Sequence, residues 1–258
     1  MEITLLHVGG PTLVLDLGGV RIVTDPTFDP PGDHPAPAGP LLTKLAGPAV
    51  PAASLGRVDL VLLSHDQHDD NLDTAGRELL AAVAKEGGRV LSTPAAAARV
   101  AGVEGLAPWD TAQVGPLAVT AVPARHGPPG AEALAGPVTG FVVRVPDGPT
   151  VYVSGDNAAV GVVERIAERV PDVDLAVLFC GAARIPGRPE ALTLTADDAV
   201  LAARALDARH VVPVHAEGWL HFTEGPGTVA RAFAAAGLAG RLTVLPLGVP
   251  TPLAVAAR

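Results

Sequence analysis

Ten consecutive residues, 64 to 73, carry the densest group of potential metal ligands in this chain. They comprise two histidines, four aspartates and two side-chain amides, and they follow directly on the apolar run of residues 58 to 63. An apolar run of β type that ends in polar side chains places them at the carboxyl end of a strand, where open sheets gather their ligands. Because imidazole and carboxylate together suit a divalent cation, this cluster predicts a metal site.

Four shorter segments place further ionisable side chains at or just beyond the ends of strand-like runs. They carry Asp25, His126, Asp156 and His215, in that order along the chain. Each is ordinary by itself, since aspartate is common in turns and a histidine at a strand end often has a structural role. The cluster alone also fits an acidic loop that caps a following helix at Asn71. The ordered series of strand ends favours one shared site over these alternatives.

Hydrophobic periodicity predicts the elements that must position these side chains. Apolar runs predict strands at residues 3–8, 12–17, 20–24, 58–63, 89–92, 117–122, 139–145, 150–154, 173–179, 210–214 and 242–247. Helical spacing predicts helices from residue 72 to the glycines at 87 and 88, and at 94–100, 158–169, 195–206 and 227–236. A strand meander followed by alternating helices and strands predicts two sheets with outer helices.

The segment from residue 30 to residue 51 contains seven prolines and three glycines, too many for long regular elements. It lies between Asp25 and the cluster. We expect an ordered loop beside the site, with a flexible linker as the alternative.

In the order of these segments the chain resembles the metallo-β-lactamase superfamily, whose His-x-His-x-Asp-His signature is similar to residues 65 to 70. The resemblance runs from residue 7 to residue 248. It looks closest to the branch of L-ascorbate-6-phosphate lactonase and N-acyl-phosphatidylethanolamine phospholipase D. The resemblance implies an α/β (α+β) fold, a four-layer αββα sandwich, formed by a single domain over residues 1–258 with two similar halves.

The resemblance also implies how the ligands divide between metal ions. The implied ligands are His65, Gln67 and His126 for one ion, Asp69, Asp70 and His215 for the other, and Asp156 as the carboxylate that bridges both. Asp69 would also orient the attacking water, and Asp25 would support the signature loop from behind the ligands.

Two positions depart from the superfamily signature. Gln67 stands where the second histidine is expected, and its neutral carbonyl oxygen is a poorer donor to zinc than imidazole. Asp70 replaces the terminal histidine, and the resulting carboxylate-rich set suits manganese, magnesium or ferrous iron as well as zinc. His68 would point away from Gln67 in an extended segment, but a loop relaxes that rule. We therefore expect one or two divalent ions, with Gln67 as a ligand of the weaker site and His68 behind the ligands or in contact with substrate. Ligation by His68 in place of Gln67 is the alternative.

The resemblance implies hydrolysis of a small phosphoester, lactone, amide or related substrate. A divalent cation makes hydrolysis possible at neutral pH, because it lowers the pKa of a bound water from about 15.7 towards about 7. The candidates for substrate contact are Arg125, Glu217, Trp219, His221 and, as an anion clamp, Arg184. The alternatives are a non-catalytic relative that binds a ligand without turning it over, a nuclease, and oxygen chemistry at iron.

Charge and composition narrow the expected partners to a small-molecule substrate. The formal net charge is −9 and no basic stripe is visible, which argues against nucleic acid. A single cysteine, Cys180, excludes an intramolecular disulfide, so we expect a cytoplasmic protein. The first residues are typical of a strand rather than a signal peptide, and no apolar stretch approaches the ~20 residues of a membrane helix. An oligomer is compatible with the sequence.

Overall fold

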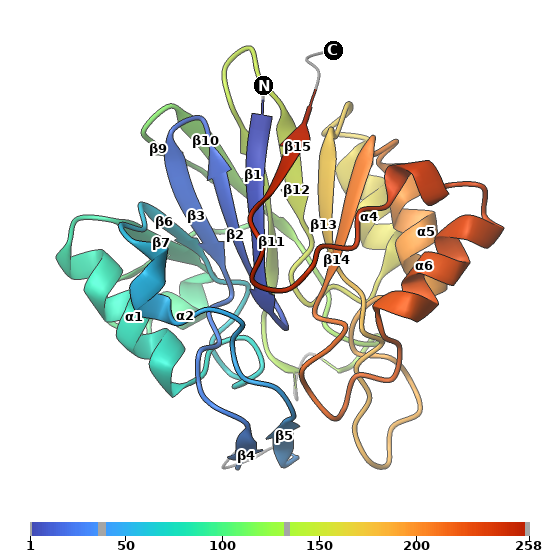
Figure 1. Cartoon of the computed structure of the whole chain (residues 1–258), viewed down its shortest axis with the longest axis horizontal. Coiled ribbons are helices and arrows are strands. Elements are labelled where there is room, and N and C mark those ends of the chain that lie inside the picture. Colours follow the sequence, from blue (N-terminus) through green and yellow to red (C-terminus); the bar gives the residue numbers. More distant parts are fainter. Residues whose placement is uncertain (1, 36–39, 132–134, 256–258) are drawn as a thin grey trace.

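Two large sheets lie face to face at the centre of the molecule, and helices cover their outer sides (Figure 1). The computed structural model describes residues 2–35, 40–131 and 135–255. Its layers are those of the predicted four-layer α/β sandwich.

The first sheet has seven strands and is built mainly from the N-terminal part of the chain. In spatial order they are β15 (Thr251–Ala254), β1 (Glu2–Gly9), β2 (Thr12–Leu17), β3 (Val20–Thr24), β6 (Leu60–Leu62), β7 (Arg89–Ser92) and β8 (Val103–Gly105). β1, β2 and β3 form the predicted antiparallel meander, with Leu15 opposite both Leu5 and Ile22. β3, β6, β7 and β8 run parallel.

The second sheet has six strands. In spatial order they are β14 (His210–Val214), β13 (Leu175–Phe179), β12 (Thr150–Val153), β11 (Thr139–Arg144), β10 (Leu117–Pro123) and β9 (Thr111–Val114). β12, β13 and β14 are parallel, and the other pairs are antiparallel. In both sheets the strands that precede the predicted site residues therefore end on the same side.

An aliphatic core fills the space between the sheets, where leucine and valine side chains surround Phe141 and Phe179. The helices that lie wholly within the described residues are α1 (Thr74–Lys85) and α2 (Pro94–Ala97) beside the first sheet, and α4 (Val160–Ala167), α5 (Ala196–Ala205) and α6 (Pro226–Ala235) beside the second. Two short 3₁₀ turns are η1 (Ala52–Leu55) and η2 (Ala239–Arg241). Each fully buried aliphatic side chain contributes about 1.5–3 kcal/mol to this packing.

Two helix starts follow from capping residues in the sequence. Asp73 accepts a hydrogen bond from the Gly76 backbone at 2.8 Å, so α1 begins after it rather than at residue 72. Thr195 and Asp198 form a capping box at the start of α5, as the predicted helix at 195–206 suggests.

The strand predicted at residues 242–247 does not form. That segment makes only isolated bridges, from Leu242 to Val211 and from Leu247 to His7, while β15 takes the edge of the first sheet. Pro246 lies in the segment and has no backbone N–H to donate, which explains why a continuous ladder fails.

The proline-rich segment contains a small hairpin, β4 (Gly32–His34) and β5 (Leu42–Lys44), at the end of the molecule where the central strands finish (Figure 1). Lys44 forms an ion pair of 2.9 Å with Asp73, and both side chains are buried. The described part of this segment is thus tied to the start of α1, as expected of an ordered loop.

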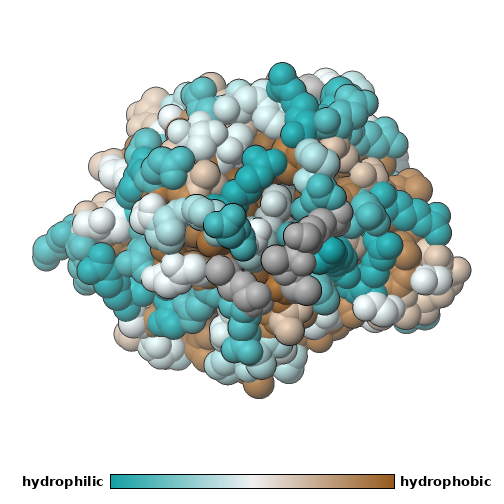
Figure 2. Space-filling view, turned by 90° about the horizontal axis from the view of Figure 1, so that it is seen from above, coloured by the Kyte–Doolittle hydropathy of each residue, from teal (hydrophilic) through white to brown (hydrophobic). Residues whose placement is uncertain are grey.

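The opposite end of the molecule, where β1 begins and β15 ends, is covered by hydrophilic side chains with smaller hydrophobic areas between them (Figure 2). Among the described residues, no helix has the length and apolar character needed to cross a membrane.

Candidate metal centre

The carboxyl ends of β6, β10, β12 and β14 bring six potential ligands together in two groups. The first group is His65, His68 and His126, and the second is Asp70, Asp156 and His215. Within each group the ligand atoms lie within 4.8 Å of one another. The first sheet supplies His65, His68 and Asp70, and the second supplies the other three.

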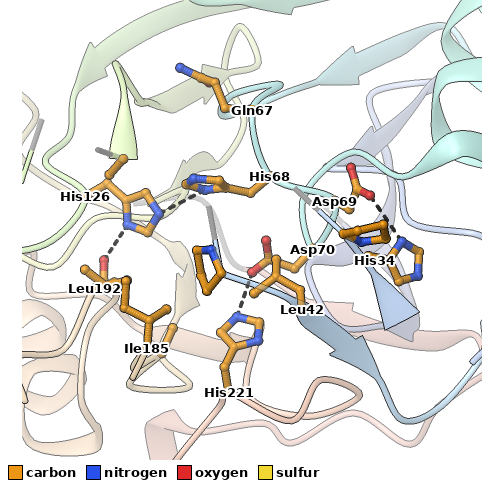
Figure 3. A pocket seen from close by; sticks show the side chains of 14 residues that line it. His34, Leu42, Gln67, His68, Asp69, Asp70, His126, Ile185, Leu192 and His221 are labelled. Atoms are coloured by element: carbon orange, nitrogen blue, oxygen red, sulfur yellow. Dashed lines mark hydrogen bonds and ion pairs between the residues drawn. The ribbon is translucent and has the colours of Figure 1, made fainter. Parts of the chain in front are cut away.

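Three imidazole nitrogens converge in the first group. Nδ1 of His68 lies 2.9 Å from Nε2 of His65 and 3.3 Å from Nε2 of His126, and the contact between His68 and His126 is drawn in Figure 3. On the far side of its ring, Nδ1 of His126 lies 2.7 Å from the Leu192 carbonyl oxygen. A carbonyl only accepts, so His126 carries its proton on Nδ1 and directs the lone pair of Nε2 into the group.

The carboxylate of Asp156 lies between the two groups. Its Oδ2 is 3.4 Å from Nε2 of His126, and its Oδ1 is 3.4 Å from Nδ1 of His215. In the second group, Oδ2 of Asp70 lies 3.3 Å from Nε2 of His215. One oxygen of Asp156 thus faces each group, the arrangement expected of a bridging carboxylate.

The electrostatics of both groups fit a cation. Burial lowers the pKa of His65 far below its usual value and also lowers that of His68, so both imidazoles are neutral at pH 7. Burial alone would raise the pKa of Asp70 and Asp156, but nearby histidines, above all His215, outweigh it and lower both. These carboxylates in turn overcome the effect of burial on His215 and raise its pKa.

Unpaired buried atoms give an independent test of the fit. In the described part of the chain, Oδ1 of Asp70 is buried without a hydrogen-bond partner, and neither ring nitrogen of His215 makes a hydrogen bond. Leaving such atoms unsatisfied costs free energy, about 1–3 kcal/mol for each group. The imidazoles, the buried carboxylates and these atoms without a hydrogen-bond partner together form a ligand set that fits divalent metal ions.

The backbone beneath the ligands is specialised. His215 has a φ of 55°, and its N–H donates to the Gly10 carbonyl at 2.7 Å, which holds this strained conformation. Gly155 has a φ of 53°, and a Cβ there would lie 2.5 Å from the Thr139 carbonyl oxygen and 2.7 Å from Cβ of Ser64. Glycine therefore lets the two sheets approach closely just before Asp156.

Asp25 lies behind the ligands, as the resemblance implies. Its carboxylate accepts from the backbone N–H of Ser64 and, at 3.2 Å, from the side chain of Asn71. The same amide nitrogen of Asn71 lies 3.1 Å from Oδ1 of Asp156. Burial raises the pKa of Asp25 to about 7. Asn71 thus connects Asp25 to the carboxylate that faces both groups.

Two residues predicted as ligands lie outside the groups. The side chain of Gln67 packs against Gly136 and points away from the histidines (Figure 3). Asp69 pairs instead with Nδ1 of His34 at 3.2 Å. The physical reason is a tight turn in which the N–H groups of residues 71 and 72 both donate to the His68 carbonyl. This turn directs His68 and Asp70 into the site, so the spacing in the chain is His-x-x-His-x-Asp.

The predicted substrate contacts are dispersed. The Arg125 guanidinium donates to the Gly127 carbonyl, and that of Arg184 donates to the Pro189 carbonyl, so both are engaged with the backbone. Glu217 accepts from the Gly10 N–H at 2.6 Å. The other two candidates are aromatic: Trp219 is buried, with its ring 5.0 Å from that of His34, and His221 lines the cavity at the metal centre.

The cavity beside the two groups has a volume of about 100 Å³. Its floor includes His68, Asp70 and His126, and its walls include Leu42, Ala183, Ile185 and Leu192. Among the residues that the structure describes, no lysine or arginine lines it.

Two residues of the hairpin were not anticipated. His34 lines its rim, and Lys44 reaches Asp73 beneath the hairpin. Both lie in the proline-rich segment, where no periodicity marks the direction of a side chain. The only available signal was the position of that segment between Asp25 and the cluster.

Comparisons with known proteins agree with this geometry. A family model described as a beta-lactamase superfamily domain matches residues 20–216. A protein of Methanoregula boonei named as a metal-dependent hydrolase is 30% identical over 181 residues, which cover 68% of this chain and 75% of the relative.

Two solved structures are similar over nearly the whole chain. An isothiocyanate hydrolase from Delia radicum gut bacteria has a TM-score of 0.81 at 22% identity, covering 99% of this chain and 100% of its own. A possible metal-dependent hydrolase from Veillonella parvula has a TM-score of 0.83 at 16% identity, covering 97% and 99%. At these identities the likeness concerns the fold.

Proposed function

The chain belongs to the metallo-β-lactamase superfamily and is a metal-dependent hydrolase, and from this premise we propose that it uses two divalent ions to hydrolyse a small, uncharged electrophile. The observation that carries the proposal is the pair of ligand groups on the floor of a cavity whose walls are apolar.

The residues of the two groups would bind different metal ions. His65, His68 and His126 would hold one ion, Asp70 and His215 the other, with Asp156 between them. Metal ions held by these residues would supply an activated water molecule and would polarise the substrate bond at which that water attacks. The imidazoles of His65 and His68, whose pKa values burial lowers, supply lone pairs.

The remaining polar contacts hold this set in place. The hydrogen bond from Asn71 fixes Asp156, and Asp25 anchors Asn71 in turn. Asp69, which the sequence suggests as the residue that orients the water, pairs with His34 instead and has no such role in the proposal.

The walls of the cavity favour a neutral substrate over a phosphoester. Leu42, Ile185 and Leu192 offer apolar contact, and the described lining provides no cationic side chain for a phosphate oxygen. Esters, lactones and isothiocyanates are small neutral carbon electrophiles that fit these walls. The isothiocyanate hydrolase with a similar fold makes that compound class the first to test.

The test compares substrates on metal-loaded protein. We expect kcat/KM for benzyl isothiocyanate or a γ-lactone to exceed that for bis(4-nitrophenyl) phosphate by at least about tenfold, equivalent to ~1.4 kcal/mol. His126→Ala should lose both bound metal and turnover, whereas His210→Ala, a change outside the site, should keep both. Preference for the phosphodiester would overturn the substrate class. Metal binding without turnover of any substrate would instead indicate a ligand-binding relative.

A further inference from the structure

His221 reaches the second ligand group from a loop that lies outside the signature segment. Its Nε2 is 3.0 Å from Oδ2 of Asp70 (Figure 3). That oxygen also lies 3.3 Å from Nε2 of His215. Two imidazoles from the second half of the chain therefore converge on one carboxylate oxygen, while Oδ1 of Asp70 is buried without a hydrogen-bond partner.

The loop holds the His221 ring in place. The carbonyl of His221 accepts from the Arg184 N–H at 2.9 Å, and the preceding residue, Leu220, donates to the Thr43 carbonyl at 3.0 Å. The ring packs against Phe222 with 4.5 Å between centroids. The side chain is 12% exposed, so it points inward rather than into solvent.

The spacing of these atoms fits ligands that share one ion. Two ligand atoms that lie about 2.0–2.2 Å from one tetrahedral ion are about 3.4 Å apart. The two contacts of Asp70 Oδ2, at 3.0 and 3.3 Å, are close to that separation. Asn71, the residue after Asp70, contacts Asp156 through its amide N–H, which cannot bind a metal ion, and its Oδ1 is buried without a hydrogen-bond partner among the described atoms.

We propose that His221 is a ligand of the second metal ion, together with Asp70, Asp156 and His215. This role rests on the proposed function, since it requires metal at the second group. It gives that group two imidazoles and two carboxylates, a mixed set suited to zinc, manganese or iron. His221 thus has a role in metal binding rather than the substrate contact that the sequence suggests.

The alternative is that His221 only orients Asp70 through a hydrogen bond, and His221→Gln separates the two roles. A glutamine amide can still donate to Asp70 but is a poor metal ligand. Zinc affinities would be measured by competition with a chromophoric chelator on the full chain. We expect His221→Ala and His221→Gln each to weaken one of two zinc sites by at least about 100-fold, beyond the 10–100-fold typical of orienting partners, with the other site unchanged.

A matched control is His210→Gln, at a partly exposed position on β14, which should keep both affinities. Zinc X-ray absorption gives a second readout, in which fully loaded His221→Gln should show fewer imidazoles per zinc than the unaltered protein. If His221→Gln keeps the affinity and the imidazole count, His221 is not a ligand. If the unaltered protein binds no zinc, manganese or iron at all, the proposed function itself fails, so the two failures are distinguishable.

Discussion

At the scale of single residues, contacts to the ring nitrogen that points away from the site determine which imidazole nitrogen faces it. The Leu192 carbonyl fixes the proton of His126 on Nδ1, and the Ser64 hydroxyl lies 2.9 Å from Nδ1 of His65. Such contacts orient a ligand before any metal arrives and reduce the entropy lost on binding. His68 has no comparable anchor among the contacts described, because its Nδ1 faces the other two imidazoles.

The first prediction concerns the departure from the superfamily signature at Gln67. We expect Gln67→His to leave the zinc stoichiometry unchanged, because this side chain packs against Gly136 rather than facing the ligands. His68→Asn should lose zinc from the first group. Elemental analysis after dialysis against buffered zinc measures both variants. A higher zinc content in Gln67→His would contradict this prediction and would indicate that the side chain at position 67 binds metal.

The second prediction is a pH dependence that follows from His68. Burial lowers its pKa below the usual 6.5, so the unfolded chain binds a proton that the folded chain resists. The free energy of unfolding of the metal-free protein should therefore fall as the pH decreases below about 6.5. Urea unfolding between pH 7 and pH 5 would show a steeper loss in the unaltered protein than in His68→Asn. Parallel curves would contradict the prediction.

At the scale of elements, one carboxylate joins the hairpin, the loop after β3 and the start of α1. Asp73 caps α1, accepts from the N–H groups of Phe28 and Asp29, and pairs with Lys44 of β5. Gly76 permits the contact with the loop after β3, because a Cβ there would lie 1.9 Å from the Pro26 carbonyl oxygen. These contacts of Asp73, which we call the clamp, therefore hold the C-terminal end of the ligand-carrying segment, residues 65 to 73, in place.

The third prediction tests this clamp. Asp73→Asn should lower the free energy of unfolding by about 3–5 kcal/mol, because it leaves the buried ammonium of Lys44 without a countercharge. Lys44→Met should cost less, since Asp73 keeps three backbone donors. Urea denaturation of metal-free protein gives both values. Equal losses in the two variants would show that the ion pair does not determine the stability of the clamp.

The elements differ in how well sequence alone could predict them. Long apolar runs such as β2, β3 and β14 have the predicted bounds, because burial on a sheet imposes a pattern over five or more residues. The three-residue strands β4, β5 and β8 are too short to show any period. No residue of the edge strand β15 is buried, so its apolar pattern is weak.

At the scale of the whole molecule, the strand meander and the later alternation of helices and strands predicted two sheets with outer helices, as the structure has them. The order of strand ends predicted one shared site for His65, His126, Asp156 and His215, which the structure brings together. The turn after His68 determines that His68 and Asp70 face the site while Gln67 and Asp69 do not, and the sequence spacing could not predict this turn. His221 was predicted near the site, but its contact with Asp70 depends on a loop path without periodicity. The lactonase and phospholipase branch suggested by the sequence stays a prediction.

The division of the ligand groups between the two sheets bears on when the protein can acquire metal. The first group draws on residues 65 and 68 of one sheet and residue 126 of the other, and the second group needs residue 215. Neither sheet alone offers a complete set, so an ion cannot act as the template around which the chain first collapses, as it does in a zinc finger. Contacts so distant in sequence form slowly. We therefore expect metal to bind after the two sheets have assembled, and not before.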